Sequence, residues 1–540
     1  MMVTDRVRNS MNTRMDLWKY LPVIGMSAVG KMLLTISGTL FIVLAILSYG
    51  GVLPLGASDF AFLFLLTTLA AAYRPGWIFL LLVSVLPIEI VNLAPASFGS
   101  GIHPYQFLMV AIFVGLGIRI LARRSVPSRP KLHVGDILLL LVPIGSVFAT
   151  LNAPVPGATL RFSVILFSFY ALYALFRIYV RSSEDIGRIL PFSIMSSLLT
   201  IGVAIAQNVI FLGGKGFFEV MPGRPNGLFA EPDWLGMFLV SVFATLITAG
   251  YFIASRSSSA RECFRMKRSV FLSLGLIACL VALILSVSRS AWLGAGAVAF
   301  VAIALTFLAG RPRVAGILAV MIGGSAVLAF DLVTLAPLTN FDLFGRAESI
   351  GSGRQTITVS CERPIALPEH VASVDELASF GCRHINLEEV GSESAAGRFV
   401  VEIDRDDPNV SIRKQIYNRS LVLGREHLVL GIGWGTIGDV LGHDERGAGL
   451  NASDVFLEVW LGSGILGLVG LLGFLLLLAI RALRDFFHLH GTFPFFLLTA
   501  FSGLVAFDLL NSGILLGFFF ALLGIAGSYL FHESDFTETL

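Results

Sequence analysis

Long apolar runs separated by short polar loops make up most of the chain, and one long polar stretch, residues 333–452, interrupts them near the C-terminus. A helix that crosses a membrane needs about 20 mainly apolar residues. The apolar runs predict spans at Leu33–Tyr49, Asp59–Tyr73, Trp77–Val91, Tyr105–Leu121, Asp136–Thr150, Phe162–Phe176, Ile189–Leu212, Trp234–Ala254, Val270–Val287, Ala291–Leu308, Val314–Leu332, Ser453–Ile480, Phe493–Leu510 and Ile514–Phe531. Because several of these runs are short or share a boundary, the pattern predicts an all-α polytopic membrane protein with about 12–14 transmembrane helices.

Composition supports this class. Of the 540 residues, 56% are hydrophobic and only 14% are charged, which excludes an ordinary water-soluble protein because too much hydrocarbon would face water. The segment Met1–Tyr20 carries basic residues without a clean apolar core, so no cleavable secretory signal is expected. The net charge of +2 does not indicate a nucleic-acid partner.

The lysines and arginines predict which ends of the spans face the cytoplasm. With the N-terminus inside, 23 of the 38 basic residues lie in cytoplasmic segments, and the short outer loops hold only Arg161, Lys215, Arg224 and Arg289. Short cytoplasmic loops are enriched in Lys and Arg, whereas long loops are exempt from this rule. We therefore expect cytoplasmic N- and C-termini and an extracytoplasmic loop at residues 333–452.

This division predicts three parts: N-terminal transmembrane helices at 1–332, the large outer loop at 333–452, and C-terminal transmembrane helices at 453–540. Within the loop, Thr356–Ser360 and Arg398–Asp404 are typical of strands, and Ser373–Phe380 is typical of a short helix. They indicate a small, acidic α/β insert at about residues 355–407. The segment Ser411–Glu426 has the spacing of a helix, which the glycines of Gly431–Gly435 should end.

The four cysteines permit one disulfide. Cys361 and Cys382 both lie in the outer loop, where an oxidising compartment would allow them to pair; two free thiols are the alternative. Neither a CxxC motif nor a tight cluster of His and Cys is present in the sequence. We therefore expect neither a metal site nor a cofactor.

Arginines at the predicted outer surface are the first candidates for chemistry. Arginine at membrane depth is costly and usually faces a partner or a water-filled cavity. Its planar guanidinium suits a bidentate grip on a phosphate. A diphosphate site is therefore one interpretation of these arginines, and interfacial snorkelling or loop solubility is the other. Arg224, Arg289 and Arg413 are favoured for the site because each lies within a longer motif.

The first motif is Gly223–Gly236, a polar turn that leads directly into a span and carries Arg224, Glu231 and Asp233. Carboxylates near the N-terminus of a helix are stabilised by its dipole, so helix capping is the ordinary role for Glu231 and Asp233. The functional alternative is that Glu231 accepts a proton from an acceptor hydroxyl.

Two further motifs follow along the chain. The second, Ser286–Gly294, is a tight outer turn with one cation, Arg289. The third begins at Arg413 and continues through Gly431–Gly435 and Asn451 to Gly464-Ile465-Leu466-Gly467-Leu468.

In these three motifs the sequence resembles the O-antigen ligase and O-antigen polymerase superfamily. Arg224–Gly236 resembles the family's R-x-x-G-x-F-x-(E)-P-(N/D)-x-L-G entry to a span, and Ser288–Ser290 resembles its S-R-(S/G) turn. The third motif resembles its final signature of an Arg-bearing helix, a G-x-G-x-G turn and N-x-x-(F/Y)-L-x6-G-(I/L)-L-G-L. The large outer loop before the last spans matches the family's topology.

The resemblance implies roles for individual residues. Arg224 and Arg413, with Arg289 as a third, would bind the diphosphate of a lipid-linked sugar donor. Ligases of the family usually place a histidine directly before the asparagine that corresponds to Asn451, and this chain does not. Its nearest histidine, His443, lies eight positions earlier, so His443 or Glu231 is expected to serve as the base.

We therefore expect a glycosyltransferase of the bacterial inner membrane that acts at the outer face, in cell-surface or exo-polysaccharide biosynthesis. The resemblance implies a polyprenyl-diphosphate-linked glycan as donor and a glycan or lipid as acceptor. Membrane lipids and other polysaccharide assembly proteins are the further expected partners. A lipid-linked glycan transporter or flippase, or a non-catalytic export component, is the alternative. The family alone does not separate ligase from polymerase.

Overall fold

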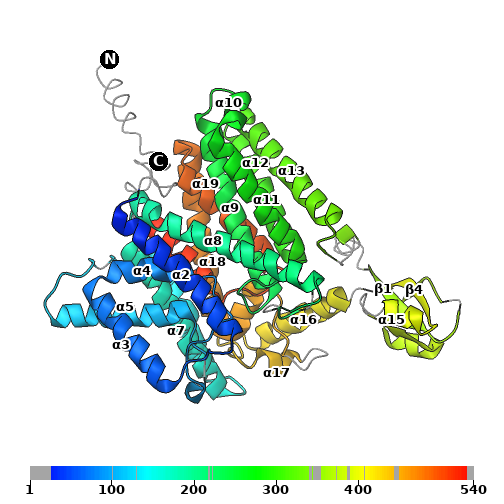
Figure 1. Ribbon diagram of the computed structural model, residues 1–540. Coiled ribbons are helices and arrows are strands. Elements are labelled where there is room, and N and C mark those ends of the chain that lie inside the picture. Colours follow the sequence, from blue (N-terminus) through cyan, green and yellow to red (C-terminus); the bar gives the residue numbers. More distant parts are fainter. Residues whose placement is uncertain are drawn as a thin grey trace.

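The computed structural model describes residues 26–99, 101–128, 130–216, 219–221, 223–339, 343–344, 354–365, 367–372, 374–385, 390–406, 408–442 and 449–531. Within these residues, nine helices are long and apolar enough to cross a membrane. They are α2 (Ala28–Tyr49), α5 (Pro104–Leu121), α7 (Pro156–Tyr179), α8 (Ser183–Leu212), α9 (Pro232–Arg256), α11 (Lys267–Leu285), α12 (Arg289–Leu308), α13 (Pro312–Leu335) and α18 (Val455–Leu489). The helices pack into one bundle (Figure 1).

Five shorter apolar helices complete the bundle: α3 (Ala57–Tyr73), α4 (Pro75–Val85), α6 (Val134–Ala149), α19 (Thr492–Asp508) and α20 (Gly517–Phe531). Together with the nine longer helices they account for every predicted span, which confirms the all-α polytopic class. Among the described residues outside both these spans and the insert, four further helical elements are present: η3 (Ala96–Phe98), α10 (Ala260–Arg265), α16 (Pro408–Glu426) and α17 (Ile437–Leu441).

Small residues bring the helices of the bundle close together. A Cβ atom added at Gly145 of α6 would lie 2.3 Å from the carbonyl oxygen of Ser463 in α18, and one added at Gly470 would lie 2.3 Å from that of Leu138. Glycine lets helix backbones approach in a membrane, where van der Waals packing rather than the hydrophobic effect drives association. Helix α9 is the most enclosed of the long helices and forms the centre of the bundle.

Polar contacts gather at the two ends of the bundle. At one end, Arg177 pairs with Asp136 at 2.8 Å, and the Tyr251 hydroxyl donates to the carbonyl of His490. All of these residues lie at helix ends that the charge pattern predicts to be cytoplasmic. Helix α10 lies at this end and α16 at the other (Figure 1). Segments predicted to lie on opposite sides of the membrane, such as α10 and α16, are therefore at opposite ends of the bundle. The structure by itself does not assign either end to the cytoplasm.

Cysteine labelling tests the orientation. With a membrane-impermeant maleimide, the variant Ser392→Cys should label in intact spheroplasts, because residue 392 is exposed on the insert. The variant Ser258→Cys, exposed beside α10, should label only after lysis. The native thiols of Cys263 and Cys279 are buried and provide the background control. Labelling of Ser258→Cys from outside would contradict the predicted orientation.

One predicted span is wrong at its C-terminal end. Helix α4 stops at Val85, whereas the apolar run predicted helix as far as Val91. Pro87 has no N–H for a helical hydrogen bond and disfavours helical backbone at the preceding residue. The chain then continues as buried, non-helical backbone, in which the N–H groups of Glu89 and Ile90 donate to the carbonyl of Leu228, each at 2.8 Å. Such backbone is tolerated inside a membrane protein only where protein groups satisfy it.

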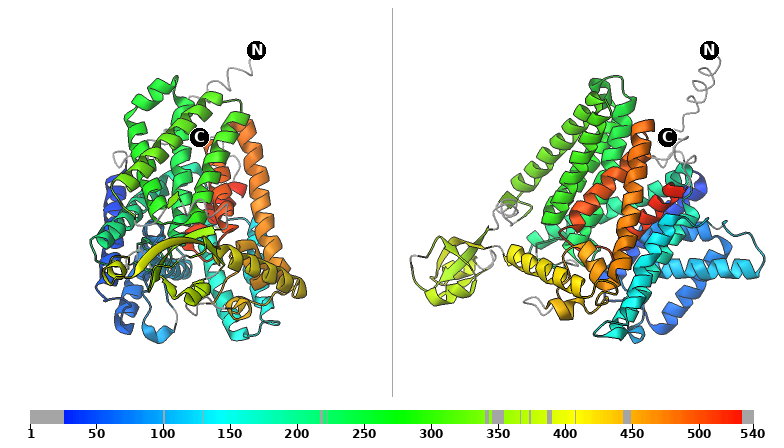
Figure 2. Two further views of the ribbon diagram at one scale, coloured as in Figure 1. Left: turned by 90° about the vertical axis from the view of Figure 1, so that its right-hand side faces the viewer. Right: turned by 180° about the vertical axis from the view of Figure 1, so that it is seen from behind.

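The predicted α/β insert is confirmed. Its elements are β1 (Arg354–Cys361), β2 (His370–Val371), η4 (Val374–Phe380), β3 (Cys382–His384), α15 (Val390–Ala395) and β4 (Phe399–Asp406). The strands form one sheet in the order β2-β4-β1-β3, with β1 antiparallel to both of its neighbours and β2 parallel to β4. The insert stands apart from the helices beside the start of α16 (Figures 1 and 2).

The disulfide predicted for the insert is present. Cys361 and Cys382 are directly opposite each other on β1 and β3, and their sulfur atoms are bonded. The bridge joins a small core that includes Ile357, Val359 and Leu377. A core of this size is marginal by itself, so the covalent link supports the fold of the insert.

Candidate active site

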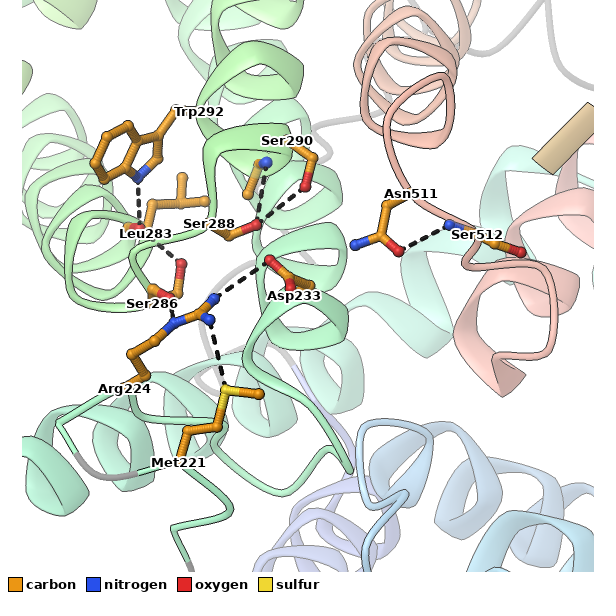
Figure 3. Close-up of polar contacts among 11 residues, drawn as sticks. Met221, Arg224, Asp233, Leu283, Ser286, Ser288, Ser290, Trp292, Asn511 and Ser512 are labelled. Atoms are coloured by element: carbon orange, nitrogen blue, oxygen red, sulfur yellow. Dashed lines mark hydrogen bonds and ion pairs between the residues drawn. The ribbon is translucent and has the colours of Figure 1, made fainter. Parts of the chain in front are cut away.

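The first motif forms a turn that places Arg224 between two other segments. Its Nε donates to the carbonyl oxygen of Ser286 at 3.1 Å, and one terminal nitrogen lies 3.4 Å from Oδ1 of Asp233 (Figure 3). The other terminal nitrogen lies 3.5 Å from the sulfur of Met221, and the whole side chain is 16% exposed. Arg224 therefore joins the turn before α9, the first turn of α9 and the turn between α11 and α12.

The second motif is a strained turn packed against the first. Ser288 caps α12 by accepting from the N–H of Ala291. The buried residue Val287 has a φ of 51°, which is unusual for a β-branched side chain. A Cβ atom added at Gly236 of α9 would lie 2.6 Å from the Cβ of Ala291, so α9 and α12 are in close contact here. Strain of this kind is retained where the surrounding packing enforces it, often at functional sites.

Arg289 is half-buried as the first residue of α12. A cation at a helix N-terminus is disfavoured by the helix dipole. An anion bound at this turn would offset that cost. The three seryl residues around Arg289 are buried, and Ser288 and Ser290 share a hydrogen bond of 3.1 Å.

The third motif begins on α16, a helix that lies outside the spans. Tyr417 donates to the carbonyl oxygens of Ser453, at 3.2 Å, and Leu509, at 3.1 Å. These contacts fix α16 against the start of α18 and the end of α19. Arg413 lies one turn before Tyr417 and is half-buried. Burial raises the pKa of Tyr417 and the charge of Arg413 lowers it, as expected for close neighbours.

The glycine turn of the third motif fills a break in α18. At Gly464 the backbone has a φ of 64°, and helix geometry is lost. The N–H groups of Ile432 and Gly433 donate to the carbonyl of Leu461, at 2.7 and 3.1 Å, and the Trp434 indole donates to Ser463. Gly464 and the Gly431–Gly435 turn are therefore required for packing, and the turn satisfies backbone groups that the break leaves without helical partners.

Glu231 is the N-cap residue of α9, but its side chain makes no capping hydrogen bond, contrary to the capping role that the sequence suggests. The side chain is exposed. Desolvation by the surrounding protein, together with the charge of Asp233, raises the pKa of its carboxyl group, and Arg224 opposes this effect. A carboxylate with a raised pKa is a stronger proton acceptor than an ordinary exposed glutamate.

Polar residues at the end of the long loop and the start of α18 have structural partners. Asn451 accepts from the N–H of Ser453 at 2.9 Å, and Asp454 caps α18 by accepting from the N–H groups of Phe456 and Leu457. His443, the other candidate base, lies outside the described residues. Among those residues, no group of three or more His, Cys, Asp or Glu side chains is arranged to hold a metal ion.

The loop between α19 and α20 connects the motifs in space. Tyr417 of the third motif binds Leu509 at the start of this loop. A Cβ atom added at Gly513, in the same loop, would lie 2.4 Å from the sulfur of Met237, one turn after Asp233 on α9. Figure 3 shows Asn511 of the loop in the same view as Asp233 and Ser290. The structure thus brings Arg224, Glu231, Asp233 and the Arg289 turn together, and links them to the Arg413 helix through this loop.

Two buried polar residues behind the site were not selected from the sequence. Gln207 is 0% exposed within α8, and Glu89 is 4% exposed after α4. The side chain of Gln207 and the backbone N–H of Glu89 hold the turn of the first motif, and the carboxyl group of Glu89 accepts from Gly517 and Tyr105. Each interrupts an apolar run, and a polar residue in such a run is a recognisable sign of a structural or functional partner.

These features define a polytopic membrane protein with an arginine-bearing polar site at one end of its helix bundle. Residues 274–472 match the family model described as O-antigen ligase. The match confirms, over these residues, the predicted resemblance to the O-antigen ligase and O-antigen polymerase superfamily. It covers the second and third motifs and the insert, whereas Arg224 and Glu231 precede it. No curated protein and no solved structure matches the chain.

Proposed function

We propose that the protein is an inner-membrane glycosyltransferase that transfers or polymerises glycan from a polyprenyl diphosphate carrier at the outer face of the membrane. The acceptor is a hydroxyl group on another glycan or on a lipid. The match of residues 274–472 to the O-antigen ligase family model supports this proposal. The arrangement of Arg224, Glu231 and the Arg289 turn supports it independently, because Arg224 and Glu231 precede the matched residues.

The observation that carries the proposal is the contact between the first two motifs. Arg224 reaches across to Ser286, so that its guanidinium, the half-buried side chain of Arg289 and the carboxylate of Glu231 lie around one turn. A diphosphate needs cationic donors, and an attacking hydroxyl needs a proton acceptor. Arg224 is paired with Asp233, so a bound diphosphate would replace that partner or share the guanidinium with it.

The residues have separate roles in the proposed transfer. The bond between the sugar anomeric carbon and the phosphate oxygen breaks, and a bond between that carbon and the acceptor oxygen forms. Glu231 takes the proton of the acceptor hydroxyl. Arg224, Arg289 and Arg413 stabilise the charge that develops on the departing polyprenyl diphosphate, which requires no nucleotide sugar.

A glycan transporter is the alternative, and the interruption of α18 at Gly464 is the feature that favours it, because transporters often use broken helices. Here, however, the backbone of Leu428–Gly433 occupies the break. Purified protein in nanodiscs, given a defined polyprenyl-diphosphate glycan and an acceptor, should form the glycosidic product without another protein. Movement of the donor across a liposome bilayer without product would favour the transporter.

The glycan profile of a deletion strain separates ligase from polymerase. Loss of long chains with retention of single repeats on the acceptor would identify a polymerase. Accumulation of finished chains on the polyprenyl carrier would identify a ligase. An unchanged profile of all surface and secreted glycans would contradict the proposed function.

A further inference from the structure

The turn that carries Arg224 and Glu231 is held by a side chain from a different helix. Gln207 of α8 accepts from the N–H of Gly227 at 2.8 Å and donates to the carbonyl of the same residue at 2.9 Å. One side-chain amide thus pairs with one backbone residue in both directions. Gly227 lies three positions after Arg224 and four before Glu231, so this pairing fixes the centre of the turn.

The turn is also held from the opposite side and from within. The carbonyl of Leu228 accepts from the N–H groups of Glu89 and Ile90, and the Asn226 side chain donates to the carbonyl of Phe229. The Glu89 carboxyl group in turn accepts from the N–H of Gly517, the first residue of α20. These contacts are buried, where a displaced polar group would be left without water.

Gly227 leaves little freedom for another arrangement. Its φ is 59°, a conformation that favours glycine, and an added Cβ atom would lie 3.1 Å from the side chain of Leu235. The turn therefore has one closely packed conformation, and the side-chain amide of Gln207 hydrogen-bonds to its backbone at Gly227.

We propose that Gln207 is a positioning residue for the transferase site: through its two hydrogen bonds to Gly227 it sets where Arg224 meets the donor diphosphate. The inference rests on the proposed function. It gives α8, a helix outside the three motifs, an indirect role in donor binding. Displacement of a binding group by about 1 Å can cost about 100-fold in rate.

The neighbouring residue provides a matched control. Asn208 is also in α8 and 2% exposed, and its side-chain amide also donates to a loop carbonyl, that of Leu338 after α13. Its contact does not involve the Arg224 turn. Comparison of Gln207→Met with Asn208→Leu therefore separates loss of a buried hydrogen bond in α8 from displacement of Arg224.

The test is a double-mutant cycle on kcat/KM for the lipid-linked donor, measured with full-length protein in nanodiscs. Gln207→Met should lower kcat/KM about 10- to 100-fold, mainly through the KM for the donor. The double variant with Arg224→Ala should be little worse than the poorer single variant, because both changes remove the same contact. Asn208→Leu should stay within about twofold, and its effect should multiply with that of Arg224→Ala.

Gln207→Asn is a second variant that keeps the test informative if Gln207→Met fails to fold. It keeps an amide in α8 but is one methylene too short to make both bonds, so it should show the same coupling to Arg224→Ala. A normal kcat/KM for the donor in both Gln207 variants, or losses that simply multiply with that of Arg224→Ala, would overturn this inference and leave the proposed function standing. A normal kcat/KM of Arg224→Ala would instead overturn the diphosphate site, and this inference with it.

Discussion

Replacement of Arg224 by alanine should lower glycan transfer about 10- to 150-fold, the loss expected when one charge-assisted hydrogen bond to a phosphate is removed. The variant should still accumulate in the membrane, because the contacts of Gln207 and Glu89 hold the turn without the guanidinium. Product formation from a polyprenyl-diphosphate glycan, at matched protein amounts, measures the effect.

Two further variants test whether the loss of activity in Arg224→Ala comes from the loss of its guanidinium at this position. Arg224→Lys should recover little activity, since lysine cannot reproduce a bidentate grip or both observed contacts to Ser286 and Asp233. Arg161→Ala is the matched control, because Arg161 is predicted to face outward, is exposed, donates to the carbonyl oxygen of Gly99 and lies outside the motifs. It should keep near-normal activity.

Arg413→Ala should cause a loss in the same range, about 10- to 150-fold, because Arg413 would contact the same donor from α16. Tyr417 holds that helix in place independently of Arg413. If both Arg224→Ala and Arg413→Ala make wild-type amounts of product at normal expression, the diphosphate site is wrong.

Glu231→Gln should lower turnover about 100-fold or more, because a general base typically contributes about 10²- to 10⁴-fold. Glutamine keeps the size and polarity of the side chain but cannot accept the proton. The loss should therefore fall on kcat, with the KM for the donor little changed. Asp233→Asn is the informative neighbour: it removes a carboxylate that pairs with Arg224 and should mainly change donor binding.

The pH dependence gives a second measurement on the same residue. A base must be deprotonated, so activity falls as the pH drops through its pKa. Because desolvation and Asp233 raise the pKa of Glu231, the acid limb should lie at a higher pH than for an ordinary glutamate. Arg224 lowers this pKa, so residual activity of Arg224→Ala should show the limb shifted further upward.

His443→Ala is the comparison that can reverse this assignment. We expect only a modest loss, since the family position beside Asn451 is occupied by Leu450 and His443 lies seven residues before Leu450 in the chain. Near-normal turnover of Glu231→Gln together with an inactive His443→Ala would return the protein to the histidine-based ligase pattern.

Most of the fold could be predicted because the membrane imposes a simple rule on the sequence. An apolar run long enough to cross must be helical, since only a helix satisfies its own backbone there. The insert was equally predictable, because apolar and polar residues alternate along its strands and because it lies in the one long polar stretch of the chain. Arg354–Cys361 and Phe399–Asp406 each extend only a little beyond the predicted strands.

Hydrophobicity does not show where an apolar segment stops being helical. Helix α4 ends at Val85 and α18 breaks at Gly464, although both runs remain apolar beyond these points. In each case a segment distant in sequence supplies the hydrogen bonds that the helix gives up: Leu228 for the first and Leu428–Gly433 for the second. The hydrophobicity pattern records local preference and does not identify such a distant partner.

By itself, the sequence determined the membrane class, the α/β insert and the three motifs, because each depends on residues close together in the chain. For Cys361 and Cys382 it allowed both a disulfide and two free thiols, and the structure shows the disulfide. Only the tertiary structure decided that Arg224 meets the Ser286 turn and that the glycines of the third motif pack into α18. The tertiary structure also decided that the side chain of Gln207 hydrogen-bonds to the backbone of Gly227. These contacts join separate helices, and their geometry depends on how the whole bundle packs.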